Sequence, residues 1–216
     1  MEVKVMKSIV GVNQEIADAN RKQFEKKGIV AVNIMASPGA GKTSLILALA
    51  EKLKNKADIY VIEGDIASTI DAQKMEENGI PVIQINTGGG CHLDANMVQV
   101  AAKDLDIRDN SLLFIENVGN LVCPAAFDLG ESIRLVLAST PEGHDKPYKY
   151  LGMFESADMV VINKMDVKEY VGFDNEIFYK GLRSLNEKAP VFEISCRTGK
   201  GIDELADWLK DKVDAG

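Results

Sequence analysis

Eight consecutive residues in the first quarter of the chain have the composition of a phosphate-binding loop. They are Ala36-Ser37-Pro38-Gly39-Ala40-Gly41-Lys42-Thr43, followed by Ser44. Small residues let successive backbone N–H groups turn towards phosphate oxygens, and a helix that starts at the loop adds the positive end of its dipole. In such a loop Lys42 contacts the β- and γ-phosphates, and the Thr43 hydroxyl binds Mg²⁺. The expected phosphate-binding residues are Ser37, Pro38, Gly39, Ala40, Gly41, Lys42, Thr43 and Ser44, with Lys42 and Thr43 also assigned to catalysis.

The flanks of this loop have the patterns of a strand and a helix. Residues 29–35 form an apolar run suited to a buried strand, and apolar side chains recur at helical spacing from Leu45 to Leu53. The usual loop pattern has glycine at the position of Ala36, where alanine makes a positive φ costly. We therefore expect an extended backbone at Ala36. The competing interpretation is a strand-to-helix turn that binds no ligand.

A second sequence element specifies the base. Asn163-Lys164-Met165-Asp166 follows a predicted strand and matches the Asn-Lys-x-Asp signature of guanine-nucleotide-binding proteins. The Asp166 carboxylate can accept hydrogen bonds from guanine N1–H and N2–H₂, whereas adenine lacks this pair of donors and would leave the carboxylate unpaired. The Lys164 stem can cover the base plane, and Asn163 is expected to tie this loop to the phosphate loop. The alternative is a charged helix start with Asp166 as its N-cap.

A third element of the same kind follows the last predicted strand. Ser195-Cys196-Arg197 resembles the Ser-Ala-Lys element of GTPases, in which backbone N–H groups meet the guanine carbonyl. Cys196 replaces the usual alanine, a small-for-small change that leaves a backbone contact intact. We therefore assign Cys196 to the base-binding loop rather than to a metal site, and we expect Arg197 to flank the base.

Two acidic residues at the ends of predicted strands are candidates for sensing the γ-phosphate. Glu116 begins a Glu-Asn-Val-Gly stretch where GTPases usually have Asp-x-x-Gly, so its carboxylate can bind Mg²⁺ directly or through water while the Gly119 N–H meets the γ-phosphate. Asp65 is the expected switch residue, which binds Mg²⁺ or orients the attacking water, and Asp71 is a weaker candidate for the second role. Ordinary N-capping of the following helices is the alternative. The expected magnesium ligands are Thr43, Asp65 and Glu116, and the two acids complete the catalytic set.

Cysteine and histidine occur in two loops that follow consecutive predicted strands. Cys91 and His92 end a Gly-Gly-Gly-Cys-His stretch, and Cys123 lies in the loop after the next strand. Both loops leave the carboxyl edge of the sheet, so the three side chains can converge as a soft N/S ligand set suited to Zn²⁺ or Ni²⁺. Three ligands leave one coordination position for water or another subunit, which indicates a transfer or interface site. Two buried thiols and a loop histidine are the alternative.

The elements that must position these residues alternate between strands and helices, which predicts an α/β fold with a mostly parallel sheet flanked by helices. Further strands are expected at residues 58–63, 81–86, 111–117, 133–139, 159–163 and 191–195. Further helices are expected at residues 66–78, 93–105, 148–155, 175–186 and 202–213. Residues 1–28 are expected to form an amphipathic helical arm that packs on the domain or on a partner. Residues 29–216 are expected to form a single P-loop GTPase domain that includes the metal-binding loops.

Composition narrows the functional classes. The 216 residues carry a formal net charge of −8 and have a pI near 4.9, which argues against a binder of nucleic acid or of an anionic membrane. No apolar run approaches the roughly 18 residues of a membrane helix, and the N-terminus lacks the apolar core of a signal peptide. We therefore expect a cytoplasmic protein. Its three cysteines, at dissimilar spacings, do not suggest a disulfide framework.

Four stretches make the chain resemble the HypB family, the nickel-insertion GTPases of [NiFe]-hydrogenase maturation. In chain order they are Gly-Gly-Gly-Cys-His-Leu, Glu-Asn-Val-Gly-Asn-Leu-Val-Cys-Pro, Pro-Glu-Gly-His-Asp-Lys-Pro and Asn-Lys-Met-Asp. The resemblance extends from about Gly11 to Val213. It implies the SIMIBI-type G-domain fold of signal-recognition and nitrogenase-iron-type NTPases. It also implies a homodimer favoured by GTP, an interface metal site formed by Cys91, His92 and Cys123, and nickel handover with the metallochaperone HypA towards the hydrogenase large subunit.

Some members of this family carry an additional N-terminal Cys-rich nickel motif or a His-rich segment. Residues 1–90 of this chain contain neither Cys nor His, so the G-domain site is expected to serve alone or with HypA. Cys123 lies seven residues after Glu116, and we therefore expect nucleotide state to move one metal ligand relative to the other two.

Three other functions remain open at this point. A GTPase accessory protein of another nickel enzyme, such as urease, would have the same nucleotide-binding motifs. A Cys-Pro-His metal motif would then be expected, however. The other two are an ATP-dependent kinase of the same loop class and a nucleotide-gated scaffold with little turnover. The stretch from Pro141 to Pro147 is expected near the nucleotide or the dimer interface, with His144 exposed rather than a metal ligand.

Overall fold

A parallel sheet forms the centre of the molecule in this computed structural model, which describes residues 9–66 and 68–215. Within those residues the sheet has seven strands in the order β3-β2-β4-β1-β5-β6-β7, and every pairing is parallel. The strands are β1 (Val30–Ala36), β2 (Ile59–Asp65), β3 (Val82–Asn86), β4 (Leu112–Glu116), β5 (Ile133–Ser139), β6 (Met159–Asn163) and β7 (Val191–Glu193). All carboxyl ends therefore meet at one edge of the sheet, where the predicted motifs lie.

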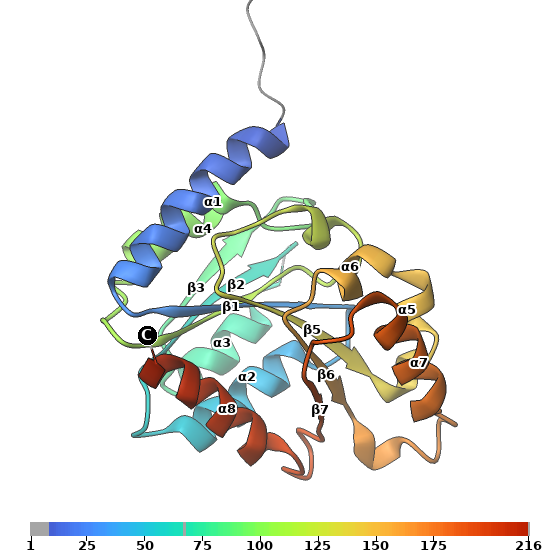
Figure 1. Cartoon of the computed structure of the whole chain (residues 1–216). Coiled ribbons are helices and arrows are strands. Elements are labelled where there is room, and N and C mark those ends of the chain that lie inside the picture. The colour runs from blue at the N-terminus through green and yellow to red at the C-terminus, as the bar shows by residue number, and fades with distance from the viewer. Residues whose placement is uncertain (1–8, 67, 216) are drawn as a thin grey trace, which may run out of the picture.

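Helices cover both faces of the sheet (Figure 1). They are α1 (Ile9–Lys26), α2 (Lys42–Leu53), α3 (Ile70–Glu77), α4 (Ala95–Asp104), α5 (Lys146–Lys149), α6 (Leu151–Glu155), α7 (Asn175–Leu185) and α8 (Ile202–Ala215), with 3₁₀ turns η1 (Cys123–Ala126), η2 (Thr140–Glu142) and η3 (Met165–Val167). Alternate residues of β1 point to opposite faces: Val32 packs with α2 and α8, whereas Ala31 packs with α1 and α4. Such two-sided burial explains why β1 reads as a continuous apolar run.

Several element boundaries differ from the sequence-based expectation. The helix expected from residue 66 begins at Ile70, and the one expected from residue 93 begins at Ala95, because the Asp94 side chain accepts a hydrogen bond from Met97 N and caps it. The single helix expected at 148–155 is two short helices, since Tyr150 has φ −123° and ψ 57°. The last strand ends at Glu193, two residues early, so Ser195 belongs entirely to a loop.

Buried asparagines fix α1 on the domain. Asn13 Nδ2 donates to the carbonyl of Asp128 at 2.7 Å, and Asn13 Oδ1 accepts from Ala95 N at 2.8 Å. Asn20 Nδ2 donates to the carbonyls of Ala95, at 2.8 Å, and Leu129, at 3.0 Å. Of the two docking options for the arm, packing on its own domain is therefore present. Residues 1–8 of the expected arm lie outside the described residues.

An ion pair adds to this contact. Arg21 donates to the Asp128 carboxylate, whose side chain is 15% exposed. Burial alone would raise the pKa of Asp128, but hydrogen bonds from Gly130 N, Arg21 and Gln14 outweigh it and lower the pKa to about 2. The folded state therefore favours the ionised carboxylate more strongly than the unfolded chain does.

Replacing Asp128 with Asn is expected to lower the free energy of unfolding by about 2 kcal/mol at pH 7, since one unit of pKa shift is worth about 1.4 kcal/mol. A depressed pKa stabilises the fold above a pH of about 4, and this stabilisation is lost as the pH falls towards 2. The difference between wild type and D128N, measured by urea unfolding, should therefore shrink at about pH 3. D109N, which changes an exposed carboxylate, is the control and should cost less than about 0.5 kcal/mol. An equal penalty for D128N at both pH values would contradict this account.

Candidate functional site

The predicted phosphate loop connects β1 to α2 at the carboxyl edge of the sheet. Ala36 is the buried last residue of β1 and does not have a positive φ, as expected. Gly39 and Gly41 have φ of 74° and 104°, conformations in which a side chain would be strained. A Cβ on Gly41 would also lie 2.5 Å from Asn163 Nδ2, so glycine is required there on two counts. Lys42 is the first residue of α2, at the positive end of its dipole.

The Asn-Lys-x-Asp loop is tied directly to the phosphate loop, as the sequence predicts. Asn163 Nδ2 donates to the carbonyl of Ala40 at 3.0 Å, and Lys164 Nζ donates to that of Gly39 at 2.6 Å. Asn163 Oδ1 accepts from the backbone N of Lys164, at 2.7 Å, and of Cys196, at 3.2 Å. One buried amide therefore joins all three loops that the sequence assigns to nucleotide binding.

A cavity of 340 Å³ lies beside this junction. Asp166 faces it, and Ser195 Oγ donates to Asp166 Oδ1 at 2.7 Å while Arg197, 3.9 Å away, forms an outer ion pair. The lining residues are Gly41, Ser44, Asn163, Lys164, Asp166, Val167, Cys196 and Arg197, so Ser44 belongs to this cavity as well as to the loop that precedes it. A larger hollow of 630 Å³ at the opposite end of the sheet contains none of the motif residues.

Cys196 belongs to the base-side cavity, apart from the other two cysteines. Burial raises the pKa of its thiol to about 11, against a weaker opposing effect of the hydrogen bond with Asn163. The thiol therefore stays neutral near pH 7, as a small apolar side chain would. This placement agrees with assigning Cys196 to the loop rather than to a metal.

Glu116 lies at the expected end of β4 and contacts the phosphate loop. Thr43 Oγ1 donates to Glu116 Oε1 at 3.0 Å, and Glu116 is only 3% exposed. A Cβ on Gly119 would lie 2.9 Å from Pro38 Cγ, so the segment after β4 approaches the phosphate loop as closely as backbone allows. Thr43 and Glu116, both predicted magnesium ligands, are thus already in contact.

A second buried carboxyl group, Glu63, lies beside Glu116. The two residues are paired in register on β2 and β4, and Glu63 is 2% exposed. Burial raises the pKa of Glu63 to about 8, with a further contribution from Glu116, and burial raises that of Glu116 to about 7 against the opposing charge of Lys42. Among the described residues, neither Oε2 atom has a hydrogen-bond partner. Two orphaned, buried acid oxygens, one of them on the residue that Thr43 contacts, fit a hard cation such as Mg²⁺.

Glu63 was not among the site residues predicted from the sequence. The available signal was an acidic residue that interrupts an apolar run, Tyr60-Val61-Ile62, just before the strand ends. Its importance depends on β4 lying next to β2, a strand order that periodicity does not report.

Asp65 is the last residue of β2, two positions beyond Glu63. Its Oδ1 accepts from Ser68 N at 2.7 Å, which holds the segment leading to α3. Asp71 lies in the first turn of α3 and forms an exposed ion pair with Lys74 at 2.9 Å.

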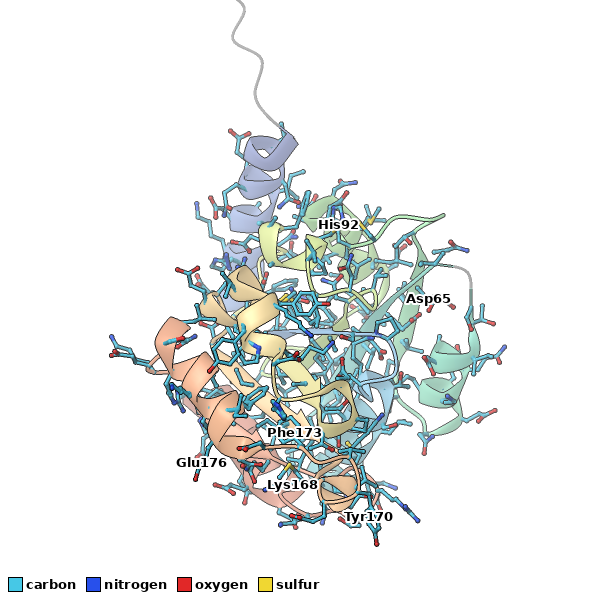
Figure 2. The ribbon with its side chains drawn as sticks, turned by 90° about the vertical axis from the view of Figure 1, so that its right-hand side faces the viewer. Asp65, His92, Lys168, Tyr170, Phe173 and Glu176 are labelled. Atoms are coloured by element: carbon cyan, nitrogen blue, oxygen red, sulfur yellow. The ribbon has the colours of Figure 1, made fainter. Side chains whose placement is uncertain are left out.

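In Figure 2, Asp65 and His92 lie in the same half of the molecule, far from the Tyr170 end.

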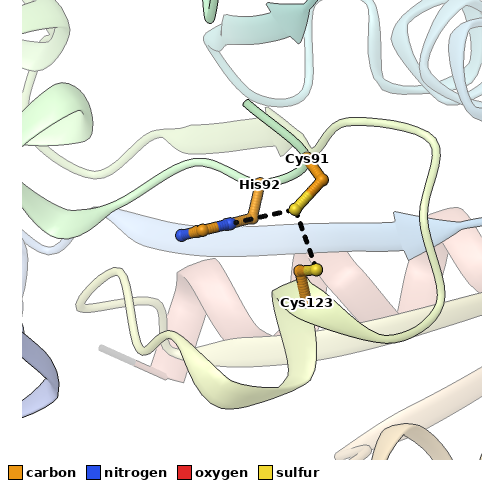
Figure 3. A group of neighbouring side chains, drawn as sticks. All are labelled: Cys91, His92 and Cys123. Atoms are coloured by element: carbon orange, nitrogen blue, oxygen red, sulfur yellow. Dashed lines mark hydrogen bonds between the residues drawn. The ribbon is translucent and has the colours of Figure 1, made fainter. Parts of the chain in front are cut away.

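Cys91, His92 and Cys123 converge as the sequence predicts (Figure 3). The Sγ atoms of Cys91 and Cys123 are 2.8 Å apart, Cys91 Sγ is 3.6 Å from His92 Nδ1, and all the ligand atoms lie within 4.8 Å of one another. The irregular backbone that adjacent ligands require is supplied by Gly88 and Gly89, with φ of 59° and 103°. The contact with Cys123 is the largest influence that raises the pKa of the Cys91 thiol. Two thiols and an imidazole at these distances form a soft donor set for Ni²⁺ or Zn²⁺.

The two thiols lie too close together for a bound metal. With metal–sulfur bonds of about 2.3 Å, two thiolates are about 3.8 Å apart on a tetrahedral centre and about 3.2 Å apart in cis positions of a square-planar one, so the Sγ atoms must separate by about 0.5–1 Å to hold the ion. Asn120 Nδ2 donates to the Cys91 carbonyl at 3.2 Å and keeps the loops adjacent, while His92 stacks on Phe127 with ring centroids 3.8 Å apart. The cluster is therefore held together by contacts outside the ligand atoms.

The stretch from Pro141 to Pro147 adjoins the base-side loop. Thr140 Oγ1, at its start, donates to the Lys164 carbonyl at 2.7 Å. His144 Nδ1 accepts from Asp174 N at 3.2 Å, and its ring meets Phe173 edge-on. His144 is half-buried, so the expectation of an exposed side chain was wrong: Phe173 and Asp174, just before α7, cover part of it.

Together, the phosphate loop, the strand order and the base-side loop define a P-loop nucleotide-binding protein of the SIMIBI type that carries a thiol–imidazole cluster. Residues 30–193 match the family model described as CobW/HypB/UreG, nucleotide-binding domain. The hydrogenase maturation factor HypB of Rhizobium leguminosarum bv. viciae is 45% identical over 208 residues, which cover 96% of this chain and 70% of that protein. The chain belongs to the HypB family.

Solved structures agree with this assignment. HypB from Helicobacter pylori in complex with nickel superposes with a TM-score of 0.88 at 36% identity and covers 94% of this chain and 96% of that one. The signal recognition particle receptor FtsY from Elizabethkingia anophelis in complex with GDP, at 14% identity and a TM-score of 0.54 over 94% of this chain and 72% of that one, shares the fold alone. Among the described residues, no helix combines the length and the apolar character needed to cross a membrane.

Asp166 is expected to decide the choice of base. Asp166→Ala removes the expected acceptor of two guanine donors and should weaken GTP binding by about 100-fold or more, because hydrogen bonds to a charged group contribute about 1.5–3 kcal/mol each. ATP binding should change by less than about threefold, which provides the internal control. Calorimetric titration of both nucleotides measures this, and a parallel loss of GTP and ATP affinity would instead indicate a collapsed pocket.

The metal ligands can be tested against a cysteine that lies elsewhere. Cys91→Ala and Cys123→Ala are each expected to weaken nickel binding by about 100-fold or more, since ligands of such sites contribute a few kcal/mol apiece. Cys196→Ala, which removes a neutral thiol from the base-side cavity, should leave nickel affinity unchanged. Metal titration of the three variants discriminates the two sites. A loss of nickel binding in Cys196→Ala would contradict the assignment.

Proposed function

We propose that this chain is a GTP-hydrolysing metallochaperone that assists nickel insertion into [NiFe]-hydrogenase. The observation that carries the proposal is that one edge of one sheet holds a phosphate loop, a guanine-type loop and a Cys91–His92–Cys123 cluster. The name of the Rhizobium relative and the nickel complex of the Helicobacter pylori relative support the same function.

Each group in the phosphate half has a role in this proposal. The loop from Ser37 to Thr43 binds the phosphates, and Lys42 contacts the β- and γ-phosphates. Thr43, Asp65 and Glu116 hold Mg²⁺, which when bound with GTP neutralises charge on the transferred phosphoryl group. Gly119 N–H meets the γ-phosphate. Asp65 also orients the attacking water, in a segment that the Ser68 hydrogen bond keeps in place.

The base half supplies selectivity. Asp166 accepts from guanine, Lys164 covers the base plane, and the backbone of the loop from Ser195 to Arg197 meets its carbonyl. Arg197 flanks the base. The contact of Asn163 with both loops supports simultaneous ordering of base and phosphates.

Nickel is the cargo in this proposal, and Cys91, His92 and Cys123 are its ligands, with a fourth position left for water or a partner. Zn²⁺ suits the same donors. We propose a homodimer favoured by GTP, with the metal at the interface, and exchange of nickel with HypA before delivery to the hydrogenase large subunit. The proposed location is the cytoplasm. Turnover is proposed to be slow, as suits a switch whose two nucleotide states each persist long enough to bind or release metal.

Nucleotide state is proposed to act on the metal through β4 and the loop that follows it. Glu116 ends β4, and Cys123 follows seven residues later at the start of η1. The Sγ atoms must move apart by about 0.5–1 Å to hold a metal, so a modest shift of this loop is enough to change affinity. Ordering of the loops at the γ-phosphate thereby controls the metal affinity of the cluster.

Nickel affinity is expected to differ by about 10-fold between the GDP and GTP-analogue states, within the range of 1–3 kcal/mol common for coupled sites. By linkage, nickel must change the relative affinity for the two nucleotides by the same factor. Titrations of nickel in each nucleotide state, and of each nucleotide with and without nickel, measure both sides. A single-turnover GTP assay in the same samples separates a GTPase from a scaffold with little turnover. Equal nickel affinity in the apo, GDP and GTP-analogue states would refute the coupling.

A further inference from the structure

We propose that Leu93 and Asn117 form a joint that transmits the nucleotide state to the metal loop. The inference rests on the proposed function, since it needs the two sites to be coupled. It assigns that coupling to two residues that bind neither nucleotide nor metal: Leu93 follows the ligand His92, and Asn117 follows Glu116.

Asn117 connects the end of β4 to the metal loop through its side chain. It is fully buried, and its Oδ1 accepts from Leu93 N at 3.2 Å and from Val118 N at 3.0 Å. Its own backbone N donates to the Ile34 carbonyl of β1 at 3.1 Å. The residue beside the γ-phosphate sensor therefore holds the backbone of the residue beside a metal ligand.

Leu93 makes a second contact, with the other carboxylate-bearing strand. It is fully buried, and a Cβ built on Gly64 would lie 2.8 Å from its Cδ2 and Cγ atoms. Gly64 stands between Glu63 and Asp65 at the end of β2. Leu93 thus lies against the ends of both β2 and β4, one through its side chain and the other through its backbone N–H.

A buried network keeps this joint stiff. Asn117 Nδ2 donates to Asn33 Oδ1 at 3.1 Å, and Asn33 Nδ2 donates to Glu131 Oε1 at 3.2 Å. Glu131 in turn accepts from Leu129 N at 2.7 Å and from Arg134 Nε at 2.9 Å. The Asn117 Oδ1 accepts two hydrogen bonds and Nδ2 donates one, so rotation of this amide would leave buried polar groups unpaired, which is costly. A shift of Glu116 is therefore passed to Leu93 rather than absorbed by rotation of the side chain.

The geometry at the cluster makes such a displacement effective. Leu93 lies one residue from His92 and two from Cys91, on the opposite loop from Cys123. The Sγ atoms are 2.8 Å apart and must separate by about 0.5–1 Å for a metal to bind between them. A joint that moves one loop relative to the other controls the coordinate that nickel binding requires.

The test compares the ratio of nickel dissociation constants in the GDP and GTP-analogue states across variants of the full chain. Wild type is expected to give a ratio of about 10. Asn117→Ala should bring the ratio below about 2, while nickel affinity without nucleotide and nucleotide affinity without nickel each stay within about fivefold of wild type. Leu93→Met keeps the backbone hydrogen bond and nearly the same side-chain volume. The flexible Met side chain packs less rigidly against Gly64 than Leu93 does, so this variant should lower the ratio at least threefold.

Asn186→Ala is the matched control. Asn186 Nδ2 donates to the carbonyls of Phe154, at 3.1 Å, and Ala157, at 2.7 Å, far from both sites, so the variant should lose thermal stability and keep the wild-type ratio. If Asn117→Ala does not fold, the ratio measured for Leu93→Met decides whether the joint exists.

The outcomes separate this inference from the proposed function. A wild-type ratio near 10 that persists in both Asn117→Ala and Leu93→Met overturns the joint and leaves the coupled function standing. An equal drop in Asn186→Ala also overturns it, because the effect would then follow stability alone. A wild-type ratio of one rejects the coupling itself, and with it the joint. Loss of the ratio in the two joint variants with its retention in the control supports the joint.

Discussion

Two carboxyl groups buried side by side, Glu63 and Glu116, are the constraint around which the functional edge is organised. Neighbouring acids inside a protein are tolerated when they are protonated or when cations approach them. Their raised pKa values, their orphaned Oε2 atoms and the nearby charge of Lys42 all express that requirement. A cation bound beside these two groups would change the electrostatics of this edge more than movement of an exposed charge could, because burial weakens screening.

Strand order arranges the three functions along the edge in sequence. The metal-ligand loops follow β3 and β4, the phosphate loop follows β1, and the base-side loops follow β6 and β7. The two buried acids lie on β2 and β4, of which β4 is next to β1 and also leads into the loop that carries Cys123. Both acids therefore lie on strands that either lead into a thiol-bearing loop or neighbour a strand that does.

Buried asparagines are the main connectors between these parts. Asn163 joins the three nucleotide loops, Asn33 and Asn117 link β1 and β4 to the metal loop, and Asn13 and Asn20 fix α1 against the elements that follow the cluster. An amide offers both donors and an acceptor, so one side chain can satisfy backbone groups from two loops at once. Because buried polar groups must stay paired, these contacts specify loop positions more sharply than apolar packing would.

The sequence by itself determined the local chemistry: the phosphate loop, the Asn163–Asp166 signature, most strand positions and the convergence of Cys91 with Cys123. Those predictions depend on residues close in the chain or on the rule that parallel strands end at one edge. Only the tertiary structure decided the Glu63–Glu116 pair, the contacts of Leu93 and the docking of α1. Each depends on strand order and side-chain register between distant segments, and hydrophobic periodicity carries no information on which strands become neighbours.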